Sequence, residues 1–106
     1  MTRGCIKRAR LTFDTVERRA SIDGMPLALS PHEIGVLEAL LNRFGRIVSK
    51  DQLVDKLYNY DKSAGHNAIE VYIHRIRRKI EGSGIAVRTL YGQGYLMEER
   101  EKDVDG

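Results

Sequence analysis

The side chains best suited to chemistry lie in the segment HNAIEVYIHRIRRKIE, residues 66–81. Its four isoleucines, from Ile69 to Ile80, recur at steps of four, three and four residues. This spacing places them on one stripe of an α-helix. The intervening arginine and asparagine side chains can donate hydrogen bonds to phosphate oxygens and to base edges. The segment therefore predicts a helix with one face for a core and another for a polyanion.

The helical rotation of 100° per residue gives each polar side chain a direction. Arg75 and Arg77 fall on the two shoulders of the outward face. Its centre holds four side chains: Asn67, Val71, His74 and Arg78. A solvated face is the ordinary explanation of a charged run, but within residues 66–80 Glu70 is the one acid, beside four arginine and lysine side chains. We interpret these six residues as a groove-facing set.

Two capping boxes mark the helices that must position this segment. Ser30 and Glu33 begin the first helix in SPHE, where proline takes the first helical position, and the glycine of RFGR ends it. Ser49 and Gln52 repeat the spacing and begin a second helix, which we expect to run to about Tyr58. GRIV is a short extended link between these helices, and NYDKSAGH is a polar loop before the cationic helix.

Short alternating runs flank the helices. Before them, CIKRARLTF, RRASID and PLALS are separated by the turn-like DTVE and IDGMP, which predicts a small antiparallel sheet. After them, IAVRTLYGQGYLM predicts a hairpin that turns at its glycines. The fold class is therefore α+β: a winged helix-turn-helix with an N-terminal antiparallel sheet, three helices and a C-terminal β-hairpin wing. We expect one domain over residues 1–97.

Charge and composition narrow the class of protein. The whole chain carries +3 and the acidic tail 98–106 carries −3, so residues 1–97 carry +6, which favours polyanionic partners. Cys5 is the only cysteine and no apolar run approaches the roughly 20 residues of a membrane span, so we expect a cytoplasmic protein without a membrane partner. No residues are arranged as a catalytic, cofactor or metal site, and we expect no enzyme activity.

The order of the elements indicates what the cationic helix does. In a helix-turn-helix the last helix enters the major groove, so we expect residues 66–81 to read double-stranded DNA. Asn67 can pair with adenine, and Val71 can contact a thymine methyl group. Arg77 and Arg78 are better suited to phosphates. A protein-interaction module, with the basic face against an acidic partner, is the alternative.

Three stretches also resemble one known family, the DNA-binding effector domains of OmpR/PhoB-type response regulators. They are LSPHEIGVLEALLNRFGRIVSKDQL, NAIEVYIHRIRRKI and VRTLYGQGYLM. The resemblance implies a transcription regulator of a bacterial two-component system, bound to promoter DNA as two copies on direct repeats and influencing RNA polymerase. It also implies a phosphoaccepting receiver domain, which is absent from these 106 residues.

The resemblance assigns further roles in the helices. Arg75 falls on a family position that often reaches base edges, and a guanidinium can donate two parallel bonds to guanine O6 and N7. Lys50 and Tyr58 match positions that contact the DNA backbone. A helix amino terminus beside phosphate supports Lys50 on dipole grounds. For Tyr58, packing in the core is an equally good explanation.

The wing, residues 85–97, departs from the family at one position. The family's typical Thr-Val-Arg-Gly-x-Gly-Tyr pattern is TLYGQGY here, so Tyr91 replaces the arginine. We therefore do not expect that arginine's insertion into the minor groove. Thr89 and Tyr95 keep the family's residue types, and Arg88 can supply a charge instead. The resemblance places this wing at the DNA backbone or minor groove.

Overall fold

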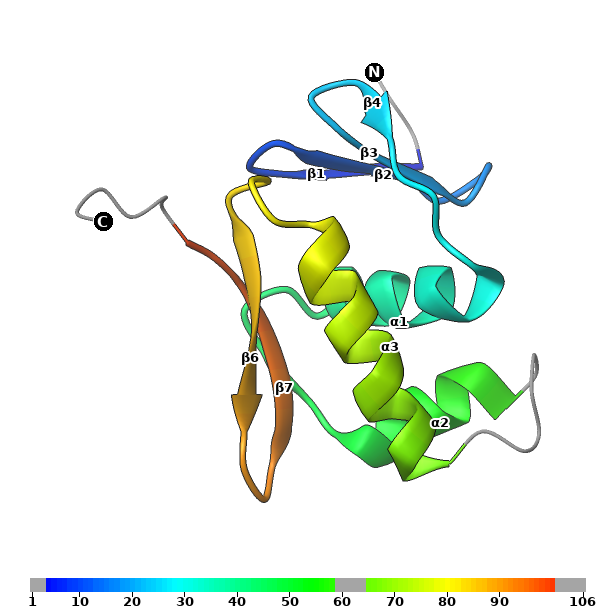
Figure 1. Ribbon diagram of the computed structural model, residues 1–106, viewed down its shortest axis with the longest axis vertical. Coiled ribbons are helices and arrows are strands. Elements are labelled where there is room, and N and C mark those ends of the chain that lie inside the picture. Colours follow the sequence, from blue (N-terminus) through cyan, green and yellow to red (C-terminus); the bar gives the residue numbers. More distant parts are fainter. Residues whose placement is uncertain (1–3, 59–64, 101–106) are drawn as a thin grey trace.

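The computed structural model describes residues 4–58 and 65–100. Figure 1 shows the N-terminal sheet across one end of three helices and a long hairpin along their side. This is the predicted α+β winged helix-turn-helix. Its elements are β1 Cys5–Arg8, β2 Leu11–Asp14, β3 Arg19–Ile22, β4 Met25–Pro26, α1 Pro31–Asn42, β5 Ile47–Val48, α2 Lys50–Tyr58, α3 His66–Lys79, β6 Ile85–Leu90 and β7 Gly94–Glu99.

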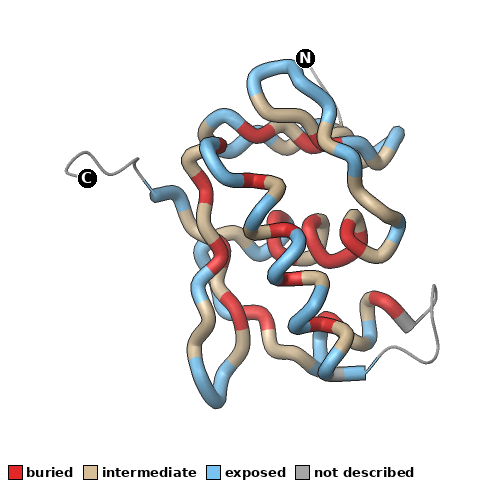
Figure 2. The backbone as a smooth tube through the Cα atoms, in the orientation of Figure 1, coloured by how far each residue is buried: buried red, intermediate tan, exposed pale blue. Residues whose placement is uncertain are grey.

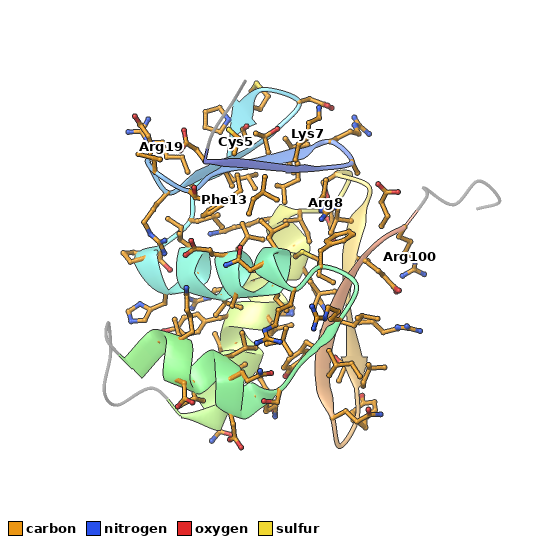
Figure 3. The ribbon with its side chains drawn as sticks, turned by 180° about the vertical axis from the view of Figure 1, so that it is seen from behind. Cys5, Lys7, Arg8, Phe13, Arg19 and Arg100 are labelled. Carbon is orange, nitrogen blue, oxygen red and sulfur yellow. The ribbon has the colours of Figure 1, made fainter. Side chains whose placement is uncertain are left out.

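The N-terminal sheet is antiparallel, with its strands in the order β1-β2-β3-β4. The prediction of one continuous run in CIKRARLTF was wrong, because Ala9 has a φ of +54° and turns the chain between β1 and β2. Alternating residue types continue through this turn and conceal it. PLALS was also wrong as a strand, since β4 ends at Pro26. In Figure 3, Phe13 lies on the helix side of the sheet, whereas Lys7 lies on the far side.

Both predicted capping boxes are confirmed. The Ser30 hydroxyl accepts a hydrogen bond from the Glu33 backbone amide at 3.2 Å, and the Glu33 carboxylate accepts one from the Ser30 amide at 3.0 Å. The corresponding Ser49 and Gln52 distances at the start of α2 are 3.1 and 2.9 Å. These bonds satisfy amides that the first helical turn leaves without partners. The third helix ends at Lys79, two residues before the predicted end.

The link GRIV contains a strand that sequence analysis missed. Ile47 and Val48 form β5, which pairs with Leu96 and Tyr95 of β7, and the second sheet has the order β5-β7-β6. The wing is thus joined to the connection between α1 and α2. β7 also continues to Glu99, so Glu98 and Glu99 belong to the wing sheet and not to the tail. Tail residues 101–106 lie outside the described residues.

One hydrophobic core joins the helices to both sheets. The isoleucine stripe of α3, from Ile69 to Ile80, is at most 1% exposed, as its spacing predicted. Phe13 of the N-terminal sheet and Met97 of the wing sheet belong to the same cluster and are fully buried. Figure 2 shows buried and exposed segments alternating along α3. No helix in residues 4–58 and 65–100 is long and apolar enough to span a bilayer.

We expect Gly94→Ala to lower the free energy of unfolding by more than about 2 kcal/mol. Gly94 has a φ of +140°, and a Cβ atom there would collide with the Val48 carbonyl oxygen. Gly92→Ala is the matched control: its φ is +79° with no atom in the way, so it costs about 1 kcal/mol. Denaturant unfolding of both variants measures the difference. Equal losses would show that close packing of β5 against β7 is not the constraint.

Candidate nucleic-acid interface

The outward face of α3 carries the predicted side chains in the predicted direction. The four central residues are all exposed: Asn67, Val71, His74 and Arg78. Val71, at 46% exposure, is one of few large apolar side chains at the surface. The opposite stripe of the same helix is buried. The helix therefore presents amide, apolar and cationic groups together on one accessible face. Whether these groups contact DNA stays a prediction.

A buried carboxylate supports one shoulder of α3. Glu33 is 2% exposed, and its Oε1 accepts a hydrogen bond from Lys79 Nζ at 2.8 Å. Lys79 also donates to the Ala28 carbonyl oxygen at 2.6 Å. Arg75 Nη1 lies 3.9 Å from Glu33 Oε2, while 56% of the Arg75 side chain remains exposed. Glu33 thus ties the last turns of α3 to the start of α1 and leaves the Arg75 guanidinium accessible.

The charge of Glu33 is kept by these contacts. Burial raises the pKa of its carboxyl group, because removal from water disfavours the charged form. The hydrogen bonds from Lys79 and from the Ser30 amide, with the positive charges of Lys79 and Arg75, outweigh this effect. The pKa of Glu33 consequently lies below its ordinary value. The carboxylate is therefore a fixed negative charge at neutral pH.

The other shoulder of α3 holds the wing. Arg77 Nε donates to the Val87 carbonyl oxygen at 2.9 Å, and Arg77 Nη2 donates to Thr89 Oγ1 at 2.6 Å. The side chain is half-buried between helix and strand. A phosphate contact of Arg77 stays a prediction, but sequence analysis missed this positioning role. Helix phase had predicted only that Arg77 lies on a shoulder of the outward face, without naming the hairpin as its neighbour.

Lys50 forms an ion pair within the domain that the sequence did not reveal. Its Nζ forms an ion pair and a hydrogen bond with Glu70 Oε2, which links the start of α2 to α3. This bond raises the pKa of Lys50 and lowers that of Glu70. Lys50 stands at the first position of α2, where a helix dipole favours phosphate. The contact of Lys50 with the DNA backbone stays a prediction, and a phosphate there would compete with Glu70 for the Lys50 ammonium group.

The wing exposes some predicted residues and buries another. Tyr91 is 91% exposed at the turn, and Arg88 is exposed with its Nε 3.4 Å from Glu98 Oε2. Tyr95 is only 4% exposed and packs in the core, although it also lines the groove beside Lys50, so its contact with DNA stays a prediction. The register of β7 turns Tyr95 inward, which its residue type alone did not reveal. The Tyr58 side chain lies outside the described part of the chain.

A groove of about 830 Å³ lies between α3, the start of α2 and the wing. Its lining brings together Lys50, Glu70, Arg77, Thr89 and Tyr91. Cationic and hydroxyl donors from three elements thus converge beside the exposed face of α3. Across the described ranges, 4–58 and 65–100, no three His, Cys, Asp or Glu side chains gather as metal ligands.

Residues 24–97 match the family model described as "Transcriptional regulatory protein, C terminal". The chain belongs to this family of OmpR/PhoB-type DNA-binding domains. The OmpR/PhoB-type domain is a DNA-binding module of transcription regulators and not an enzyme. The predicted family resemblance is thereby confirmed.

Named relatives agree with this assignment. A probable transcriptional regulatory protein, y4xI of Sinorhizobium fredii (strain NBRC 101917 / NGR234), is 41% identical over 88% of this chain. The transcriptional regulatory protein QseB of Escherichia coli O157:H7 is 36% identical over 90% of it. The chain spans 42% of the length of each of these relatives.

A solved structure has the same fold. The Klebsiella pneumoniae RstA DNA-binding domain in complex with the RstA box has a TM-score of 0.74 and 28% identity. The match covers 89% of this chain and 96% of that one. The arrangement of helices and wing in the OmpR/PhoB-type domain described above is therefore shared with a relative whose structure includes its DNA box.

We expect Glu33→Gln to lower the free energy of unfolding by about 1–3 kcal/mol at neutral pH. The folded pKa of Glu33 is depressed, so its stabilising contribution is complete above the ordinary glutamate pKa and is lost as the pH falls through the lower folded value. The difference between wild type and variant should therefore shrink on acidification. Glu17→Gln, on an exposed turn, is the control. A pH-independent difference in denaturant unfolding would contradict the role of the charge.

Proposed function

We propose that this OmpR/PhoB-type domain binds double-stranded promoter DNA sequence-specifically and thereby regulates transcription. In this proposal α3 enters the major groove, and the wing lies at the backbone or in the minor groove. One observation carries it: α3 buries its isoleucine stripe completely while it exposes an amide, an apolar and several cationic side chains on the other face. An exposed helix of this kind fits the width of the major groove.

The side chains of α3 divide into base-reading and phosphate-holding groups. Arg75 can donate two parallel bonds to guanine, because Glu33 approaches it only at 3.9 Å and its side chain remains mostly exposed. Asn67 suits adenine, and Val71 suits a thymine methyl group. Arg78 suits phosphate, and His74 lies between these groups on the same face. Base edges supply sequence information, whereas phosphates fix the position of the helix.

The wing supplies the second contact surface. Arg77 bonds to Val87 and Thr89, so the hairpin stands at a fixed position beside α3. Tyr91, exposed at the tip, presents an aromatic ring and a hydroxyl group at the position of the arginine in the Thr-Val-Arg-Gly-x-Gly-Tyr pattern of the resemblance. Arg88 contributes charge, which Glu98 partly neutralises in the free protein. These features favour a contact of the wing with the DNA backbone. Its electrostatic attraction to phosphate is weaker than that of a wing with arginine at the tip.

The role of the whole protein is also a proposal, which its relatives support. The chain spans 42% of the length of the y4xI and QseB proteins, so any further domain and the other molecules it acts on are proposed here. We infer a cytoplasmic response regulator of a two-component system, with a receiver domain that governs this domain and with RNA polymerase as its target. The RstA domain complex supports promoter DNA as the direct ligand, through its 0.74 TM-score to this chain.

Selection from randomised duplexes tests the function, and Arg75→Ala tests the reading of bases. We expect wild type to enrich a sequence, and Arg75→Ala to lose about 1–3 kcal/mol on that sequence and much less on random DNA. Arg19→Ala, on the N-terminal sheet in Figure 3, removes the same charge and is the control. Equal weakening of all duplexes by Arg75→Ala would make Arg75 a phosphate anchor. No enrichment by wild type would contradict sequence-specific binding.

Two copies should bind direct repeats cooperatively, with half-sites about one helical turn apart so that both meet the same side of DNA. Insertion of roughly half a turn between the repeats should abolish cooperativity and leave the affinity of each single site unchanged. Titration of both duplexes in a mobility-shift assay measures this effect. Cooperative binding that does not depend on the spacer would rule out the tandem arrangement.

A further inference from the structure

Glu70 is the only acid in α3, and it lies among the neutral and cationic side chains of the proposed DNA-binding face. It is one turn from Asn67 and from His74, and its side chain is 60% exposed. It also borders the groove between α3 and the wing. A carboxylate in this position repels the phosphates that the surrounding cations attract. The protein thus places an unfavourable charge within its own proposed interface.

The Lys50 contact shows how this charge is balanced in the free protein. Lys50 Nζ and Glu70 Oε2 are directly paired, although the residues belong to different helices. The pair carries no net charge, so Lys50 does not act as a free cation at the amino terminus of α2. A phosphate can recruit Lys50 only when it competes with Glu70.

We propose that Glu70 is a specificity-determining residue that restrains Lys50 until the correct base pair is present. This inference rests on the proposed function. On non-specific DNA, Lys50 stays with Glu70 and neutralises no phosphate. On the preferred sequence, Lys50 passes to a phosphate and the freed Glu70 carboxylate accepts a hydrogen bond from a base. The exchange couples the contact of Lys50 with a DNA phosphate to the contact of Glu70 with a base.

The chemistry of the carboxylate selects the base. Ionised glutamate has acceptors only, so it needs a donor on the major-groove edge. Cytosine offers its N4 amino group there, whereas guanine offers only the acceptors O6 and N7. Adenine has an amino group, but its neighbouring N7 is an acceptor that repels a carboxylate. Thymine offers an acceptor and a methyl group. Glu70 therefore selects cytosine at the base pair that faces the first turns of α3.

Glu70→Gln tests the restraint, because it removes the charge and preserves the shape. Non-specific affinity should rise about two- to fivefold, as the freed Lys50 gains a phosphate. The slope of log affinity against log salt should steepen by about 0.9 for random DNA. Glu17→Gln removes the same charge on a distant turn and should leave the slope unchanged. The double variant Lys50→Met with Glu70→Gln should return to the wild-type slope.

Glu70→Ala tests the base contact, because it removes the acceptor. In selection from randomised duplexes, the variant should lose the preference for cytosine at one position by at least about fivefold and keep its other preferences. Unfolding curves establish that both Glu70 variants are folded. Identical salt slopes for Glu70→Gln and Glu17→Gln, or an unchanged base preference in Glu70→Ala, would overturn the inference. Wild type that enriches no sequence would instead overturn the proposed function itself.

Discussion

The buried carboxylate of Glu33 is the interaction on which the geometry of this domain depends. One oxygen closes the capping box of α1 and binds Lys79 of α3, so a single side chain serves both helices. An unpaired charge at this depth would be strongly destabilising, which means that α1 and α3 cannot separate without a large loss of free energy. The angle between α1 and α3, the helix proposed to read DNA, is therefore fixed electrostatically as well as by packing.

The wing holds α3 on the side opposite Glu33. Arg77 donates to β6, while β5 links β7 to the connection between α1 and α2. α3 thus has polar supports on both shoulders and an apolar core beneath it. Its central outward residues carry none of these structural bonds. Substitutions at Asn67, Val71 and His74 can consequently change the surface without changing the scaffold, a division that suits one fold to many target sequences.

Local sequence patterns predicted most of the fold because their causes are local. Each capping box lies within four residues, and the isoleucine stripe reports its own buried face. The failures involve distant partners. β5 has only two residues and is defined by β7, half a chain away. The contact of Lys79 with Glu33 spans 46 residues, and the inward direction of Tyr95 depends on strand register. Helix phase could identify exposed candidates but not the partners that restrain them.

The central position of β7 has a consequence for the synthesis of the protein. β7 lies between β5 and β6, and its Met97 is fully buried in the core. A ribosome that adds about 5–20 residues per second completes α1 several seconds before it reaches this strand. During that interval the apolar faces of the helices have no wing sheet to cover them. The wing sheet is therefore completed late, and α3, the helix proposed to read DNA, gains the support of the wing only after β7 has been translated.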